Sequence, residues 1–464
     1  MALVKSLCNF CFPLKTNCVK LLLHLQPLAR SISKTATTST MSHSKTFSFT
    51  DYDVIGFDLD YTLLRYNLSE IIPLEYFNIV NFLVEKRDYP RKLLEPIGGD
   101  IDLMQKGLIF DAEKGNTLKI GPTGRILKAA HGSKFLTLSQ IVEEYGPEQQ
   151  WSVTNQFIKD PLSTWNGPIS EKMRALLDYF DMPASLAFAR SVDAIDSQKG
   201  GRLQKYEVYS DILASLIENY KRENFLEGTS DYFEALKKDP QRYILKTSPS
   251  VLTWLKQLKA TKTTYLLTGS NTDFVNLTAS TAFGPDWRNL FDIVLCYARK
   301  PGFFVANNNR QFFTVDGVKE VANIEHNELE LNKTYTQGNW KALEKLFQKK
   351  SQKLNPKCLY VGDNLIQDIY TPVEHAQMDT VCISEELLAE AGDRNYQFSE
   401  IITSESWGSY FAVGKEPTLW SSIIQNKPKL YAPTVDYFAS NPIDYEYSTN
   451  VHPDPLHPYP IQLL

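Results

Sequence analysis

The sequence predicts an α/β fold whose core is a doubly wound parallel β-sheet. Four short apolar runs each end in polar or glycine residues, as buried parallel strands do; they cover residues 54–57, 265–267, 293–297 and 358–361. Helical patterns accompany the later runs, with Leu252, Leu255 and Leu258 at three-residue spacing and a second pattern over residues 340–347. Because strand and helix alternate, we expect ligands to bind beyond the carboxyl ends of the strands.

The long segment between the first two runs predicts a domain inserted into this sheet. Its pattern is mostly helical and aromatic, and the run 107–111 with the turns at Gly115 and Gly124 predicts a small antiparallel element within it. After about Asp393 the chain is rich in Tyr, Trp, Phe and Pro, and we expect these aromatic side chains to pack on the core. The expected organisation is a core over 46–64 and 245–395, an inserted cap over 65–244 and a C-terminal extension over 396–464.

The first fifty residues differ in composition from the rest of the chain. They hold six of the 49 basic residues and none of the 54 acidic ones, and they are rich in Ser and Thr. This composition is typical of an import presequence, so we expect residues 1–45 to be a targeting segment and the protein to be mitochondrial. The alternative is an untranslated or disordered extension, with Met41 as the start of a cytoplasmic protein.

Composition excludes several classes of protein. The 464 residues allow two or three domains at roughly 150 residues each. A net charge of −5 supplies no general attraction to nucleic acid or to an anionic membrane. No apolar stretch reaches the roughly 18 residues of a transmembrane helix. We therefore expect no nucleic-acid or membrane partner and a ligand held at a local site, while homo-oligomer formation stays open.

Two carboxylates follow the first apolar run. Asp58 and Asp60 lie just past the predicted end of that strand, at a spacing that lets both face one crevice. Their repulsion must be relieved by a cation or by protonation of one of them. Mg²⁺ would do so through oxygen ligands and leave one carboxylate oxygen free to attack an electrophile. The alternative for so short a motif is a loop whose acids are solvated.

The other predicted strand ends carry further polar groups. Thr268 begins a turn whose hydroxyl and backbone N–H groups can cradle phosphoryl oxygens or simply cap a helix. Lys300 follows the third run, where an ammonium can neutralise a carboxylate and a transferring phosphoryl group, although a lone lysine there is also an ordinary surface residue. Asp363 follows the fourth run as a third metal anchor, and Asp368 comes five residues later.

These residues, taken in chain order, resemble the four motifs of the haloacid dehalogenase superfamily of phosphatases. The resemblance narrows to the cytosolic purine 5′-nucleotidase family and covers about residues 51–386. The motifs that carry it are GFDLDYTL at 56–63, GLIFD at 107–111, GN at 115–116, HG at 131–132, ARKPGFF at 298–304, YTQGN at 335–339 and the GD pair at 362–363.

The resemblance implies a Rossmann-like core with a large inserted cap, and it implies a role for each strand-end residue. Asp58 would be the nucleophile that forms an aspartyl-phosphate, and Asp60 would protonate the leaving group and then activate water. Asp58, the backbone carbonyl of Asp60 and Asp363 would hold Mg²⁺. Thr268 and Lys300 would orient the phosphoryl oxygens. The last motif acid, Asp368, is assigned to a supporting position beside the metal or Lys300.

Substrate choice follows less directly from the resemblance. In this family the inserted domain reads the leaving group, and the candidate residues here are Asp196 and Lys199. Lys199 stands near the position where the purine enzymes carry a base-stacking histidine, so a purine preference does not carry over. The expected function is a magnesium-dependent phosphomonoester hydrolase acting on a small phosphorylated substrate such as a nucleoside monophosphate. Phosphotransfer to a second nucleoside is a variant, and a non-enzymatic scaffold or regulatory protein is the alternative.

Overall fold

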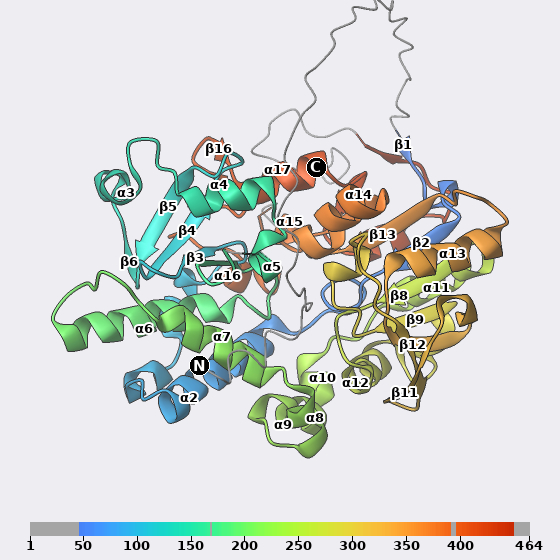
Figure 1. Cartoon of the computed structure of the whole chain (residues 1–464), viewed down its shortest axis with the longest axis horizontal. Helices are drawn as coiled ribbons and strands as arrows, with labels where there is room; N and C mark the ends of the chain where they lie inside the picture. The colour runs from blue at the N-terminus through green and yellow to red at the C-terminus, as the bar shows by residue number, and fades with distance from the viewer. Residues whose placement is uncertain (1–45, 168, 391–395, 450–464) are drawn as a thin grey trace, which may run out of the picture. The chain divides into compact units, whose positions relative to one another are not determined.

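The structure is a computed structural model that describes residues 46–167, 169–390 and 396–449 (Figure 1). The targeting segment expected at residues 1–45 lies outside the described residues, and so does the C-terminal extension from residue 450 onward. All described residues belong to one compact unit, Lys45–Leu464.

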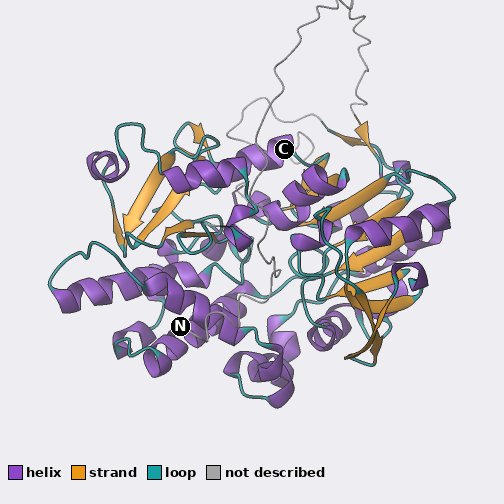
Figure 2. Ribbon diagram, viewed as in Figure 1, coloured by secondary structure: helices purple, strands orange, loops and turns teal. Residues whose placement is uncertain are grey.

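The largest sheet, called the central sheet below, has nine strands and is drawn in orange on the right of Figure 2. These strands are β2 (Val54–Phe57), β8 (Thr263–Leu267), β9 (Ile293–Cys296), β10 (Phe312–Asp316), β11 (Lys319–Ile324), β12 (Lys333–Gln337), β13 (Cys358–Gly362), β14 (Asp379–Ile383) and β17 (Leu430–Ala432). Their order is β11-β10-β12-β9-β8-β2-β13-β14-β17, parallel from β12 to β17 and antiparallel at β10 and β11. The four predicted runs form the neighbouring strands β9, β8, β2 and β13, which confirms the predicted parallel sheet.

Helices lie before, between and after these strands. The longer helices are α2 (Leu68–Lys86), α3 (Leu138–Tyr145), α4 (Ser152–Lys159), α6 (Pro183–Lys199), α7 (Val208–Asn219), α9 (Asp231–Lys238), α11 (Pro249–Thr261), α12 (Thr272–Phe283), α13 (Trp340–Ser351) and α17 (Leu419–Asn426). The shorter ones are α5 (Ser163–Asn166), α8 (Arg222–Glu227), α10 (Pro240–Tyr243), α14 (Thr371–Ala376), α15 (Glu386–Glu390), α16 (Ser399–Ile402), α18 (Asp436–Ala439) and the π-helix η8 (Leu365–Tyr370).

Alternate residues of the parallel strands pack under helices on the two faces of the sheet. Phe57 of β2 lies against Trp254 of α11, with ring centroids 5.8 Å apart. Tyr265 of β8 lies against Phe347 of α13, with ring centroids 5.3 Å apart. The two sets belong to separate hydrophobic clusters. Since both helical patterns predicted from the sequence are real helices and cover opposite faces, the α/β class is confirmed.

A second sheet has five antiparallel strands in the order β6-β5-β4-β3-β7. Its strands are β3 (Ile109–Asp111), β4 (Asn116–Ile120), β5 (Ile126–His131), β6 (Lys134–Phe135) and β7 (Met173–Ala175). Gly115 and Gly124 precede strands of this sheet with φ of 68° and 82°, a conformation that glycine adopts at little cost. The antiparallel element predicted from these glycines is therefore confirmed.

The chain crosses twice between the central sheet and the segment 65–244, and the two crossings lie side by side. The backbone N–H of Leu245 donates to the carbonyl of Arg65 at 2.9 Å, and that of Asn67 donates to the carbonyl of Tyr243 at 2.8 Å. Exit and return are thus joined by hydrogen bonds. The crossing places residues 65–67 close to the carboxylates that follow β2.

The C-terminal part contributes more to the core than its sequence indicates. Its aromatic side chains, among them Trp407, Trp420 and Phe438, are buried, as predicted. The strand β17 also pairs in parallel with β14 and forms one edge of the central sheet. This strand has only three residues, too few for periodicity to identify it. The other short strands are β1 (Thr46–Phe47), β15 (Ala412–Val413), β16 (Glu416–Pro417) and β18 (Tyr447–Ser448).

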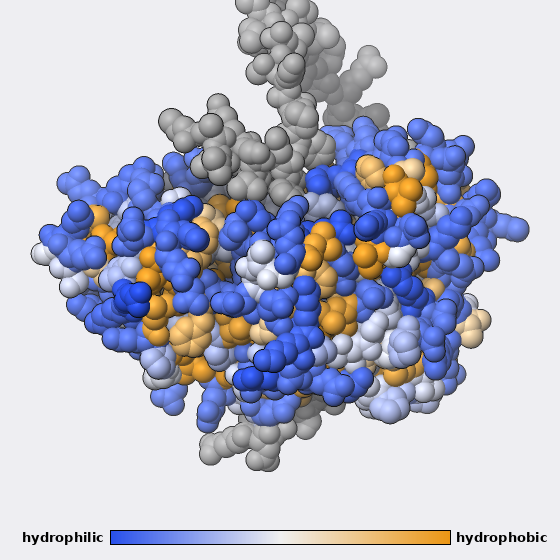
Figure 3. Space-filling view, turned by 90° about the horizontal axis from the view of Figure 1, so that it is seen from below, coloured by the Kyte–Doolittle hydropathy of each residue, from blue (hydrophilic) through white to orange (hydrophobic). Residues whose placement is uncertain are grey.

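Large exposed apolar side chains are scattered along the described residues. On the face in Figure 3, hydrophilic residues predominate and apolar ones form separate small areas. The large apolar side chains with high exposure come from distant parts of the chain, for example Leu138, Leu226 and Leu354. Among the described helices, none combines the length and hydropathy needed to cross a membrane.

Replacing Glu75 with glutamine is expected to stabilise the protein increasingly as the pH rises above about 4.5. Glu75 of α2 is fully buried, and burial, together with the nearby Asp178 carboxylate, raises the pKa of its carboxyl well above the ordinary value. The native state therefore binds a proton more tightly than the unfolded chain, so wild-type stability falls as the pH passes from the unfolded pKa through the folded one. Denaturant unfolding across this range measures the difference.

The matched control for that variant is Glu85→Gln, an exposed position in the same helix. This variant also removes one negative charge, but from an exposed carboxylate instead of a buried one. Equal pH dependence of unfolding in wild type and Glu75→Gln would show that Glu75 is not a buried titrating carboxyl.

Candidate active site

Four side chains follow the carboxyl ends of four neighbouring parallel strands. They are Asp58 after β2, Thr268 after β8, Lys300 after β9 and Asp363 after β13. Asp58 and Asp363 are 7% and 6% exposed, and Thr268 is fully buried. The charged groups therefore meet in a largely water-free crevice, where electrostatic interactions are stronger than in water.

Lys300 joins two carboxylates in this crevice. Its Nζ lies 2.7 Å from Asp58 Oδ1 and 2.6 Å from Asp368 Oδ1, and it donates to the Tyr360 hydroxyl at 3.3 Å. Burial lowers the pKa of Lys300, but the Asp368 and Asp58 carboxylates raise it by more, so the ammonium stays charged. The sequence predicted a supporting position for Asp368, beside either the metal or Lys300. In the structure Asp368 contacts Lys300 directly.

The backbone after β13 brings Asp368 into this position. Asp368 lies in the π-helix η8, a rare wide turn that is frequent at functional sites. The side chain of Asn364 caps this helix by accepting hydrogen bonds from the backbone N–H groups of Ile366 and Gln367. Gly362 leaves the space that Asp368 occupies, because a Cβ there would lie 2.4 Å from Asp368 Cβ. Glycine at the end of β13 is therefore a packing requirement.

Asp60 is held at both of its carboxylate oxygens. The Tyr66 hydroxyl donates to Oδ1 at 2.7 Å, and the Ser270 hydroxyl donates to Oδ2 at 2.8 Å. Thr268 Oγ1 lies farther away, 3.5 Å from Oδ2. Burial and the Asp58 charge raise the pKa of Asp60 to about 6. A carboxyl with a pKa near neutrality can both give and take a proton at working pH.

The site also fits a divalent metal ion. Asp58, Asp363 and Asp368 each present a carboxylate oxygen, and these oxygens lie within 4.8 Å of one another. Asp363 Oδ2 is buried without a hydrogen-bond partner among the described residues. Burial raises the pKa of Asp363, and the charges of Asp58 and Asp368 raise it further, whereas Lys106 lowers it. An oxygen-only set with an unpartnered carboxylate suits a hard cation such as Mg²⁺.

The carboxylate trio and the metal-ligand set predicted from the sequence overlap in part. The predicted ligand from Asp60 is its backbone carbonyl, and the Asp60 side chain instead bonds Tyr66 and Ser270. The carboxylate set and the predicted set therefore share Asp58 and Asp363.

The segment 65–244 contributes a buried cation that sequence reasoning missed. Lys106 Nζ lies 2.6 Å from Glu386 Oε1, and both side chains are 5% exposed or less. Glu386 also accepts hydrogen bonds from Tyr179 at 2.7 Å and Ser384 at 2.5 Å. The position of Lys106 directly before the GLIFD motif could have singled it out as a candidate residue. No pattern in the sequence indicates that Glu386 is its partner.

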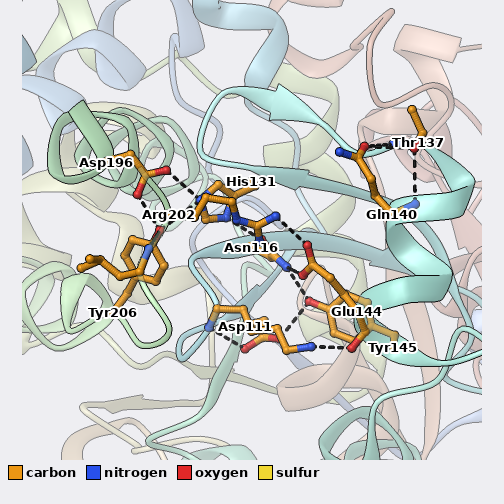
Figure 4. Close-up of polar contacts among 12 residues, drawn as sticks. Asp111, Asn116, His131, Thr137, Gln140, Glu144, Tyr145, Asp196, Arg202 and Tyr206 are labelled. Carbon is orange, nitrogen blue, oxygen red and sulfur yellow. Dashed lines mark hydrogen bonds and ion pairs between the residues drawn. The ribbon is translucent and has the colours of Figure 1, made fainter. Parts of the chain in front are cut away.

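The two candidate substrate-reading residues lie elsewhere. Asp196 of α6 accepts a hydrogen bond from the Tyr206 hydroxyl at 2.5 Å and lies 3.0 Å from His131 Nε2 (Figure 4). Lys199, at the end of the same helix, is exposed. The contacts of Asp196 thus join α6 to β5 of the antiparallel sheet and not to the carboxylate crevice.

The Asp196 contacts continue as a polar network across the antiparallel sheet. His131 Nδ1 lies 2.8 Å from Asn116 Oδ1, and Asn116 Nδ2 donates to Glu144 Oε2 at 2.7 Å (Figure 4). Arg202 pairs with Glu144 at 2.7 Å. Burial lowers the pKa of His131, and the Arg202 charge lowers it further. The network fixes the end of α6 and the loop after it against β4, β5 and α3.

Comparisons with known proteins give a clear family assignment. The model of the 5′ nucleotidase family matches residues 43–400, more than half of the chain. The chain is 34% identical over 432 residues to 5′-nucleotidase domain-containing protein 1 of Homo sapiens and 33% identical over 429 residues to the Bos taurus protein of that name. Each alignment covers 87% of this chain and 93% of the relative.

A more distant relative aligns over part of its length. The chain is 25% identical over 328 residues to 5′-nucleotidase domain-containing protein 2 of Rattus norvegicus, an alignment that covers 69% of this chain and 55% of that protein. The family match includes all the strand-end residues of the crevice described above. The chain belongs to the 5′ nucleotidase family and is, by enzyme class, a 5′-nucleotidase-like phosphatase.

Proposed function

We propose that this protein is a magnesium-dependent 5′-nucleotidase that hydrolyses a nucleoside monophosphate through an aspartyl-phosphate on Asp58. The observation that supports it most is the Asp58–Lys300–Asp368 array beside Asp60. A carboxylate nucleophile held 2.7 Å from an ammonium faces a second carboxyl whose pKa is about 6. We also propose a haloacid dehalogenase-type core over 46–64 and 245–395, with residues 65–244 as the cap and 396–464 as the extension.

The proposed chemistry has two displacements at phosphorus. In the first, a carboxylate oxygen of Asp58 attacks, the bond from phosphorus to the nucleoside oxygen breaks, and protonated Asp60 gives its proton to that oxygen. In the second, Asp60 takes a proton from water, the water oxygen attacks phosphorus, and the bond to Asp58 breaks. Inorganic phosphate leaves, and Asp60 is protonated again.

Lys300 and the turn at Thr268 orient the phosphoryl group during both displacements. The Lys300 ammonium offsets the charge of Asp58 and of the phosphoryl oxygens. Asp58, Asp363 and the backbone carbonyl of Asp60 would hold Mg²⁺, with Asp368 as a further carboxylate in reach. When bound, the ion would supply positive charge against the four carboxylates and the phosphoryl oxygens.

The proposal is tested by phosphate release from a panel of nucleoside 5′-monophosphates and sugar phosphates, with and without Mg²⁺. We expect Mg²⁺-dependent release that is lost in Asp58→Asn, and the best substrate identifies what the cap reads. If no compound of the panel releases phosphate while inorganic phosphate still binds, the alternative of a non-enzymatic scaffold or regulatory protein would be favoured.

Asp363→Asn is expected to stabilise the metal-free protein and to abolish its stabilisation by Mg²⁺. The variant removes a buried carboxylate oxygen that has no donor among the described residues, which relieves repulsion with Asp58 and Asp368. Wild-type protein should gain about 2.7 kcal/mol at a metal concentration one hundred times its dissociation constant. Thermal unfolding with and without Mg²⁺ measures both effects. Asp444→Asn, at an exposed position, is the matched control; an unchanged Mg²⁺ response in Asp363→Asn would rule out this ligand.

The location of the protein is a separate proposal, that residues 1–45 direct it to the mitochondrion. Deleting residues 1–41 is expected to move the protein to the cytoplasm and to leave its thermal unfolding unchanged. Imaging of tagged full-length and shortened chains, with a melting curve of each, measures both properties. A marked loss of thermal stability on deletion would show that the segment belongs to the fold.

A further inference from the structure

Tyr66 donates one of the two short hydrogen bonds to the Asp60 carboxylate, and Ser270 donates the other from a different part of the chain. Ser270 belongs to the turn after β8, at the carboxyl end of that strand of the central sheet. Tyr66 lies at the crossing into the segment 65–244, where it forms an isolated bridge with Ile244 of the returning chain. The orientation of Asp60 therefore depends on both the sheet and the crossing.

The Tyr66 ring is fixed by aromatic neighbours from both sides of the crossing. Its side chain is 1% exposed. The ring centroid lies 5.0 Å from that of Tyr61, which directly follows Asp60, and 5.3 Å from that of Phe180, which follows β7 in the inserted segment. Tyr61 and Phe180 also contact each other, with centroids 4.8 Å apart. These ring contacts hold Tyr66 in the position from which its hydroxyl donates to Asp60.

The hydroxyl of Tyr66 is a dedicated donor. A tyrosine hydroxyl carries one hydrogen to donate, and that of Tyr66 donates to Asp60 Oδ1 at 2.7 Å. A hydrogen bond to a charged group is stronger than one between neutral groups. Holding both oxygens of Asp60 also removes the rotation of the carboxylate that would otherwise precede each proton transfer.

We propose that Tyr66 is a positioning residue for this reaction: its hydrogen bond orients Asp60 for both proton transfers when residues 65–244 are packed against the carboxyl ends of the sheet. The inference rests on the proposed function, because it assigns Tyr66 a role through Asp60. In this proposal the orientation of the Asp60 carboxyl depends on the packing of Phe180 against Tyr66. The inserted segment therefore helps to position the catalytic carboxyl.

The test is Tyr66→Phe in the full chain, assayed with the nucleoside 5′-monophosphate that the wild-type enzyme hydrolyses fastest. We expect kcat to fall roughly 10-fold to 100-fold, the range for one hydrogen bond to a charged group, while KM stays within about twofold because Tyr66 is buried and its hydroxyl bonds Asp60. Tyr76→Phe is the matched control. Tyr76 is also a buried tyrosine, and its hydroxyl donates to the Leu93 carbonyl at 2.8 Å, so kcat should not change.

A double-variant comparison separates positioning from a general effect on the fold. In an Asp60→Asn background, Tyr66→Phe should cause no further loss of kcat, because the group through which it acts is already absent. Equal losses in both backgrounds, or wild-type kcat in Tyr66→Phe alone, would overturn the assignment. If Tyr66→Phe does not fold, Phe180→Leu serves instead: it keeps the hydroxyl, removes a ring that packs on Tyr66, and should lower kcat only where Asp60 is intact.

The controls also distinguish failure of this inference from failure of the proposed function. Activity that is lost in Asp58→Asn but unchanged in Tyr66→Phe contradicts the role of Tyr66 alone. Activity that survives in Asp58→Asn, or is absent from wild type, contradicts the nucleotidase mechanism and with it the role of Asp60.

Discussion

Asp58→Asn is expected to lower turnover by about four orders of magnitude or more while the fold is retained, the scale of loss when a covalent mechanism loses its nucleophile. The amide oxygen that remains is neutral and cannot form an acyl-phosphate by the same displacement. Asparagine has nearly the shape of aspartate, and Lys300 keeps its second partner Asp368 at 2.6 Å. The substitution also removes one of the crowded carboxylates, so thermal stability should stay level or rise.

Two measurements check this expectation. Phosphate release gives the loss of turnover, and rapid acid quenching with labelled substrate gives the phosphorylated protein, which wild type should form and the variant should not. Asp444→Asn, the same chemical change at an exposed residue, should leave both unchanged. Turnover near the wild-type value, or a label that persists in Asp58→Asn, would move the nucleophile to another residue.

The strand-end residues could be predicted from the sequence because parallel strands impose their meeting point. Asp58, Thr268, Lys300 and Asp363 each follow an apolar run, and the runs form neighbouring strands of one sheet. Once the sheet is predicted, the carboxyl ends of its strands must share an edge. The same logic does not order the strands, so the contact between Lys300 and Asp368 emerged only from the structure.

The residues that sequence reasoning missed depend on how the segment 65–244 packs. Tyr66 belongs to the residues that carry the family resemblance, but the sequence assigns it no role. Its contacts depend on a ring cluster that includes Phe180, more than a hundred positions later. Lys106 likewise pairs with Glu386, which lies far from it in the sequence. Hydrophobic periodicity identifies elements but carries no information about pairs so distant in sequence.

Asp196, which the family resemblance suggests as a substrate-reading residue, already has partners for its carboxylate in the structure. Both of its carboxylate oxygens are engaged, one by Tyr206 and one by His131. A substrate base that used Asp196 would have to replace at least one of these bonds. Asp196 can therefore contact a leaving group only after this network rearranges; without such a rearrangement another residue must do so.

Lys300→Met is expected to lower both turnover and stability, and a second substitution separates the two effects. Methionine fills similar volume but leaves Asp58 and Asp368 buried without their cation. Removing one partner of a buried ion pair costs about 3 to 5 kcal/mol, and loss of a charge that stabilises the transferring phosphoryl group costs roughly 10²-fold to 10³-fold in kcat. Denaturant unfolding and phosphate release measure the two quantities.

Adding Asp368→Asn to Lys300→Met removes one of the two stranded charges. We expect the double variant to regain a large part of the lost stability, because the remaining amide at position 368 carries no charge to desolvate. Turnover should stay low, since Asp58 and the phosphoryl oxygens still lack the ammonium. If turnover returned together with stability, Lys300 would act only by holding the crevice together; if only stability returned, its charge would be needed for the chemistry itself.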